Sequence, residues 1–151
     1  MNKRLIGAIS AGALLASGVG GAVALSADAS TGSGAAAKTH TWKFNAIQKG
    51  SHSLSKKTFA AVDVDKHKGK VVGYDTISGT FEPSTQTTTI FVAVARKGGI
   101  LYGKIGATGP STDFTGKVTG GSGDYKGATG TISTHELPNG NTTQVTVKWS
   151  N

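Results

Sequence analysis

The chain has 151 residues, a formal charge of +8 and no cysteine. The length allows one domain of ordinary size, and the lack of cysteine excludes disulfides, cysteine nucleophiles and thiolate metal sites. The excess of basic side chains favours attraction to anionic polymers, although a lysine-rich surface also serves solubility.

The N-terminal segment has the layout of a secretory signal peptide. Met1–Arg4 is positively charged, Leu5–Leu25 is an uncharged run, and Ala27–Ala29 offers small residues for a signal peptidase. We expect cleavage after Ala29 and export of the protein, with rival cleavage points after Ala24 and Ala37. An uncleaved anchor is the alternative, because the run is long enough to span a bilayer.

Residues 30–37 have the composition of a flexible linker. Residues 38–151 then form the expected domain, which keeps a formal charge of +7 without Lys3, Arg4 and Asp28. The basic character therefore belongs to the domain and not to the leader.

From Thr39 onward apolar residues alternate with polar ones, as in half-buried strands. The predicted strands cover residues 39–46, 59–65, 71–81, 87–96, 100–105, 114–119, 128–135 and 143–149. Short strands joined by turn signals, with no convincing amphipathic helix among them, indicate a β-sandwich or a β-barrel. Eight antiparallel strands can close around one small ligand.

The segments between these strands carry turn signals. Gln48–Lys57 is polar and is predicted as a loop, while Lys66–Lys70 is predicted as a charged hairpin turn. Pro138-Asn139-Gly140 predicts another hairpin, because Asn-Gly supports a type I′ turn. In the last strand, Val145, Val147 and Trp149 are expected to face one way.

The stretch from Phe114 to Thr134 contains six glycines among strand-forming residues. Glycine inside a strand pattern indicates a bulge, a sharp bend or close approach of another backbone. We therefore expect a turn or bulge at Gly120–Gly123, with strands on both sides.

The same stretch resembles a known signature. V-T-G-G-S-G-D-Y-K-G-A-T-G-T is similar to the glycine motif of dirigent proteins and allene oxide cyclase-like barrels, and Val71–Asp75 and Gly99–Ile105 resemble other strand motifs of that family. The residues that fall on the glycine motif are Gly120, Gly121, Gly123, Tyr125, Ala128 and Gly130.

The resemblance implies an antiparallel eight-stranded β-barrel and a homotrimer. Dirigent proteins steer the coupling of phenoxy radicals and allene oxide cyclases close an unstable epoxide, in both cases without a metal or redox cofactor. Thr129 stands where plant dirigent proteins commonly have arginine, and the cyclase's cysteine is absent. The resemblance therefore implies the barrel fold for this chain, but it does not imply the plant activities, because the matching residues are not all present.

Asp75 is the candidate catalytic residue. It shares a strand side with Val71, Gly73, Ile77 and Phe81, so one face would carry an acid among apolar groups. Burial in an apolar barrel would raise the pKa of this carboxyl and suit it to acid–base work. The alternatives are that this face points outward, or that Asp75 makes a structural hydrogen bond.

Further candidate substrate-binding residues depend on the strand register, because a slip of one residue reverses every side chain. They are Tyr102, Tyr125, Arg96, His135 and Glu136. No metal or cofactor site is predicted, since the four histidines are scattered and the calcium-like fragment Asp63–Gly69 lacks further oxygen ligands and is rich in lysine. The glycines do not open a helix, so a nucleotide loop is not expected either.

Two functions of different classes remain open. The first is a secreted barrel without a cofactor that binds a small apolar molecule and sequesters it or guides its cyclisation or coupling. The second is a non-enzymatic extracellular protein that binds anionic cell-wall polymer or another polyanion. Its basic residues at predicted loops would make the contacts, namely Lys56, Lys57, Lys66, Lys68, Lys70, Arg96 and Lys97. Nucleic acid is not an expected partner, because export removes it and no recognised module is present. The sequence leaves open whether a substrate is turned over.

Overall fold

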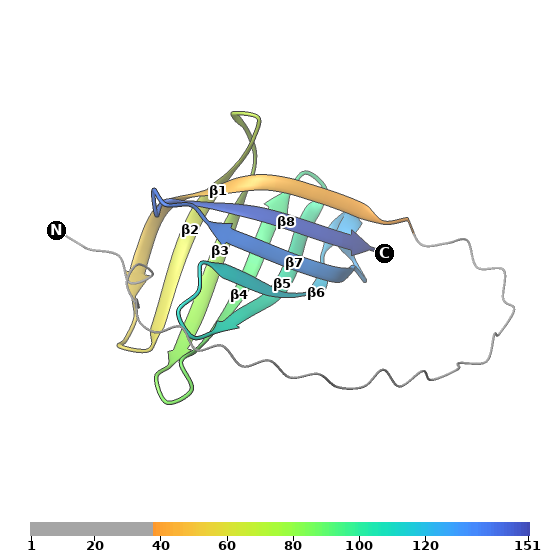
Figure 1. Ribbon diagram of the computed structural model, residues 1–151. Helices are drawn as coiled ribbons and strands as arrows, with labels where there is room; N and C mark the ends of the chain where they lie inside the picture. Colours follow the sequence, from red (N-terminus) through yellow and green to blue (C-terminus); the bar gives the residue numbers. More distant parts are fainter. Residues whose placement is uncertain (1–37) are drawn as a thin grey trace, which may run out of the picture.

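The computed structural model describes residues 38–151, which form one closed antiparallel β-barrel (Figure 1). The strands are β1 (His40–Ser53), β2 (Thr58–His67), β3 (Lys70–Glu82), β4 (Thr87–Arg96), β5 (Gly99–Thr108), β6 (Asp113–Gly121), β7 (Thr129–Glu136) and β8 (Thr142–Ser150). Each strand pairs with its neighbours in sequence, and β8 pairs with β1 to close the ring. The predicted eight-stranded barrel is thereby confirmed.

The predicted signal peptide and linker, residues 1–37, lie outside the described residues. Within residues 38–151, the structure contains no helix long and apolar enough to cross a bilayer.

The core lies inside the barrel, because alternate residues of every strand point inward. Val94, Leu101 and Val147 are almost completely buried there. The expected shared facing of Val145, Val147 and Trp149 is confirmed, since all three are buried. The alternation seen in the sequence is thus the alternation between core and outer surface.

One end of the barrel is closed by an aromatic plug, which we define as Trp42, Tyr125 and Trp149. The three rings pack edge to face with centroids 5.1 to 5.5 Å apart, and His40 stacks on Trp149 at 4.2 Å. Tyr125 also donates a hydrogen bond of 2.6 Å to the Lys97 carbonyl. We call this the capped end, and we call the opposite end, which holds the β1–β2, β3–β4, β5–β6 and β7–β8 connections, the mouth.

The glycine stretch forms the β6–β7 connection at the capped end. β6 slips register against β5 and ends at Gly121, and a single 3-10 turn, η1 (Gly123–Tyr125), follows. The predicted turn at Gly120–Gly123 is therefore present. The 3-10 turn was not expected, and its role is to bring Tyr125 into the aromatic plug.

Two local predictions need correction. Gln48–Lys57 was expected as a loop, yet β1 continues to Ser53 after a register shift between Gln48 and Gly50. A bulge inserts one extra residue and reverses the polar–apolar alternation, so the strand cannot be recognised from its pattern beyond that point.

The second correction concerns the β7–β8 turn. Gly140 has a positive φ of 60° and donates to the Leu137 carbonyl at 2.8 Å, but Asn139 is not among the residues with positive φ. A type I′ turn requires positive φ at both central residues. Pro138 fixes a negative φ at the second position of this turn, which favours a type I turn followed by a left-handed glycine.

Two glycines of the β6–β7 connection allow a matched test of how closely this connection approaches the backbone of the β4–β5 turn at Gly98 and Gly99. Gly123 and Gly127 both have positive φ, of 59° and 78°. A Cβ on Gly127 would meet nothing within 4 Å, whereas one on Gly123 would collide with the Gly98 carbonyl and lie 3.3 Å from Gly99 Cα. We expect Gly127→Ala to cost about 1 kcal/mol and Gly123→Ala about 3 kcal/mol of unfolding free energy. Urea denaturation measures both, and equal losses would contradict the close approach of the two backbones.

Candidate functional site

A cavity of about 550 Å³ opens inside the barrel on the mouth side of the core. Its walls are mostly apolar and include three phenylalanine rings, of Phe44, Phe59 and Phe114. Its mouth carries small polar and amide side chains and one acid, namely Gln48, Ser51, Ser53, Thr112, Glu136, Asn141 and Thr143. Its deepest layer, beside Val94 and Val147, holds two carboxyl groups, Asp63 and Asp75. The cavity is therefore an apolar space with acids at its floor.

A bulge between β2 and β3 brings these two acids together. The hairpin turns at Lys68 and Gly69, which have positive φ of 50° and 79°. Lys66 pairs with Val71, but Asp65 pairs with Gly73, so Val72 is an extra residue in β3. Because of this slip, Asp63 lies directly opposite Asp75.

A third acid and an arginine lie behind the pair, toward the capped end. Asp65 is fully buried, and its Oδ2 lies 3.6 Å from Arg96 Nη2. Arg96 Nη1 donates to the carbonyl of Val72, the bulged residue, at 3.2 Å. A Cβ at Gly73 would lie 2.9 Å from Arg96 Cδ, so glycine at this position leaves room for the arginine.

The arginine is also held by aromatic rings. Its guanidinium carbon lies 4.4 Å from the centroid of the Phe44 ring and 5.0 Å from that of Trp42. Cations over aromatic faces are stabilised by the ring quadrupole. Arg96 is thereby fixed between the aromatic plug and the acids, and it does not line the cavity.

The acids differ in protonation. Burial, together with the charges of Asp63 and Asp65, raises the pKa of Asp75 to about 9. Burial and the charge of Asp65 raise the pKa of Asp63 to about 6. Burial also raises the pKa of Asp65, against the opposing effects of Asp75 and Arg96. At neutral pH the cavity floor therefore holds a neutral acid, Asp75, next to a carboxylate, Asp63.

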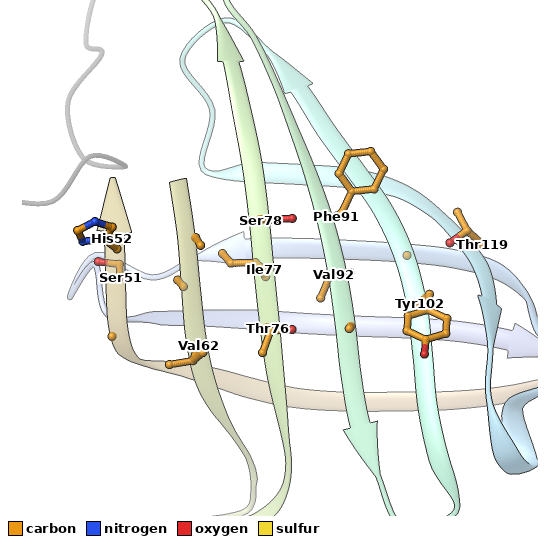
Figure 2. A pocket seen from close by; sticks show the side chains of 15 residues that line it. Ser51, His52, Val62, Thr76, Ile77, Ser78, Phe91, Val92, Tyr102 and Thr119 are labelled. Atoms are coloured by element: carbon orange, nitrogen blue, oxygen red, sulfur yellow. The ribbon is translucent and has the colours of Figure 1, made fainter. Parts of the chain in front are cut away.

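A second hollow lies outside the barrel, over strands β1 to β6. Figure 2 shows Phe91 and Tyr102 on this depression of about 650 Å³, together with Val62 and Thr76. Phe91, Val62 and Tyr102 are 54%, 49% and 40% exposed. Its lining residues, as the described part of the chain gives them, include no acid. The interior cavity combines enclosure with titratable groups, so it is the candidate site.

The structure brings some of the candidate residues together in this cavity. Asp75 faces inward at the floor and Glu136 lines the mouth. Asp75 shares its side of β3 with Gly73, Ile77 and Phe81 as expected, but Val71 lies beyond the bulge and is 52% exposed.

The remaining candidates lie elsewhere. Arg96 and Tyr125 lie inside the capped end, where both contact Trp42 and Arg96 also pairs with Asp65. Neither residue lines the cavity. Tyr102 points to the outer depression. His135 is on the outer surface, where its Nδ1 lies 2.9 Å from Asp113 Oδ1. None of these four therefore belongs to the candidate site.

Sequence reasoning missed Asp63 and Asp65. Ala60, Val62 and Val64 form the uniformly apolar side of β2, whereas the inward side carries Phe59, Ala61 and the two acids. The available signal was their spacing, because Asp63 and Asp65 lie an even number of residues after Phe59 and therefore on the same side of the strand as that ring. Their position opposite Asp75 depends on the bulge, which the sequence does not reveal.

Within residues 38–151, no group of three or more His, Asp or Glu side chains is arranged to hold a metal ion. The three interior aspartates instead lie close to one another, with one guanidinium beside Asp65.

Comparison with known proteins identifies the fold. No family model matches the chain, and no curated protein matches it in sequence. Among solved structures, the barrel is similar to a pyocyanin demethylase, with a TM-score of 0.61 and 19% identity over 74% of this chain and 100% of that one.

Two further similar structures are described as cyclising proteins. One is the Diels-Alderase AbmU from Streptomyces koyangensis, with a TM-score of 0.57 and 8% identity over 78% of this chain and 70% of that one. The other is a nonspecific heme-binding cyclase that catalyses a cycloaddition during neoabyssomicin biosynthesis, with a TM-score of 0.55 and 12% identity over 77% of this chain and 68% of that one. At these identities the likeness establishes the barrel fold. It does not extend to the dirigent family, which remains a prediction from the glycine motif.

The raised pKa values predict how stability depends on pH. A carboxyl that binds its proton more tightly when folded stabilises the protein below its unfolded pKa, 3.8 for Asp75, and this stabilisation is lost as pH rises toward about 9. We expect the melting temperature to fall from pH 5 to pH 9. Asp75→Asn, which resembles the neutral acid, should flatten this decline and raise the melting temperature at pH 9 by about 4 °C or more. Thermal scans by circular dichroism measure the effect, and parallel curves for the two proteins would argue against a buried, shared proton.

The Arg96–Asp65 contact predicts strong coupling between the two residues. Arg96→Met should cost about 3 kcal/mol, because it leaves the buried Asp65 without a counter-ion. Adding Asp65→Asn to this variant should recover part of the loss. A double-mutant cycle in urea measures the coupling, and additive effects would show that the pair is not coupled in the folded state.

Proposed function

We propose that this protein is a secreted β-barrel that binds a small apolar molecule in its interior cavity and guides the cyclisation or coupling of that molecule. The observation that carries the proposal is the pair Asp63 and Asp75, which lie side by side at the floor of an apolar cavity of about 550 Å³. A cavity of this size suits a single small ligand.

The chemistry proceeds by proton transfer and positioning. Asp75 donates a proton to the bound molecule, and Asp63 accepts one, because their environments separate their pKa values to about 9 and about 6. One proton given and one taken leaves the substrate's composition unchanged, as a cyclisation requires. The apolar walls hold the reacting atoms in one orientation and exclude water. This sequence of steps needs no cofactor.

The similar structures support the proposal only by analogy, because one fold serves many functions. Two of them are described as a Diels-Alderase and a cycloaddition cyclase. Secretion is proposed from the signal sequence, and the homotrimer from the resemblance to dirigent and allene oxide cyclase-like barrels.

The alternative, binding of a polyanion, rests on exposed lysines. Lys68 and Lys70 are exposed at the β2–β3 turn, where a polymer could contact them. Arg96 does not contribute to such a surface, because its side chain is buried against Asp65. Binding that is insensitive to salt would count against this alternative, since contacts between exposed charges are screened.

Neighbouring residues of β2 offer a matched test of the cavity. Ala61 points into the cavity, whereas Val62 points into the outer depression. We expect native mass spectrometry of the protein purified from its own host to show a bound small molecule. Ala61→Phe should fill the cavity and abolish that adduct, while Val62→Phe should retain it.

A second readout separates binding from turnover. Asp75→Asn should still carry a ligand of the same mass, and chromatography of the ligand released from each protein should show the uncyclised isomer in the variant and the cyclised one in the wild type. If Ala61→Phe does not fold by circular dichroism, Ile90→Phe fills the same cavity from β4. A wild-type protein without any adduct, or an adduct lost in Val62→Phe and kept in Ala61→Phe, would refute the interior site.

A further inference from the structure

The deep part of the barrel has an imbalance of charge. On the described strands it holds three carboxyl groups, of Asp63, Asp65 and Asp75, and one guanidinium, of Arg96. Even with Asp75 protonated, the two other acids have one cation between them. Buried charges are normally paired, because an unpaired one is costly to desolvate.

Arg96 is already committed to other partners. It pairs with Asp65, donates to the Val72 carbonyl and lies over the Phe44 and Trp42 rings. It does not line the cavity. Within residues 38–151, the carboxylate of Asp63 is therefore the part of the interior charge that has no cation paired with it.

The acids at the floor also have oxygens that receive no hydrogen bond from the protein. Asp63 Oδ1 and Asp75 Oδ1 are buried, and apart from the proton that Asp75 shares with the neighbouring acids, no backbone or side-chain group of the described chain donates to either. A shared proton on Asp75 can serve one neighbouring carboxylate at a time. A buried acceptor left without a donor costs about 1 to 3 kcal/mol, so a ligand that donates here gains that energy.

The walls define the rest of the ligand. Phe44, Phe59 and Phe114 line the cavity with aliphatic neighbours, which favours an apolar body. Aromatic faces near the floor also favour a cation. An anion would instead meet Asp63 with Arg96 out of reach behind it.

We propose that the cavity takes a ligand with an apolar body and one protonated amine, whose N–H groups bind Asp63 and Asp75 at the floor. This inference rests on the proposed function, because it assigns the substrate class of the same cavity. The ammonium would enter first, and the apolar body would fill the space between Phe59 and Phe114.

Three naphthalene probes of similar shape and different charge test the inference. They are 1-naphthylmethylamine, which is an ammonium ion at pH 7.5, neutral 1-ethylnaphthalene and anionic 1-naphthaleneacetate. Equilibrium dialysis against the purified protein gives the three dissociation constants. A charged hydrogen bond contributes about 1.5 to 3 kcal/mol, so we expect the ammonium to bind at least about tenfold more tightly than the neutral probe, and the anion to bind weakest.

Two variants test which carboxyl group causes the preference for the ammonium probe. Asp63→Asn should reduce the affinity for the ammonium to that for the neutral probe and leave the neutral probe unaffected. Asp113→Asn removes the same charge from the outer surface, where Asp113 is 65% exposed, and should leave all three affinities unchanged.

The outcomes separate the two proposals. Neutral and ammonium probes binding the wild-type protein equally well would overturn the amine inference while leaving the cavity intact. Failure of every probe to bind, or binding that survives in Ala61→Phe, would overturn the proposed function and the inference with it. The wild-type comparison needs no variant, so the inference stays falsifiable if Asp63→Asn does not fold.

Discussion

The interior of this barrel depends on one extra residue in β3. Val72 interrupts the pairing between β2 and β3, and the Arg96 guanidinium binds the carbonyl that the interruption leaves free. Without that slip, Asp63 would pair with Tyr74, whose side chain faces outward and is 59% exposed. The bulge, the arginine and the three acids therefore form one unit. Within it, the register between β2 and β3 decides which charged groups lie next to each other.

This unit explains why an apolar core can contain so many acids. Desolvation disfavours the charged form of each carboxyl. The barrel accommodates them by keeping a proton on Asp75, by pairing Asp65 with Arg96, and by placing Asp63 at the floor of the cavity. The cost of burial is thus offset differently for each acid, and among the three only Asp63 keeps a charge that faces the cavity.

Much of the fold was predictable from the sequence, because barrel strands follow a period of two and turns have specific residues. Thr87–Arg96 was predicted with the bounds of β4, and Lys66–Lys70 was predicted as a hairpin. The predictions failed where a bulge reverses the alternation, as in β1 after Gln48. Asp75 could be singled out from its apolar neighbours on one strand. Asp63 could not, because its role depends on which residue of another strand lies opposite.

The aromatic plug affects how the interior cavity can be reached from solvent. Trp42, Tyr125 and Trp149 fill the capped end, so in the part of the chain that the structure describes the cavity opens toward the mouth. A ligand of the proposed kind would enter and leave by the same route. The end of that ligand that enters first is then the end that reaches Asp63 and Asp75.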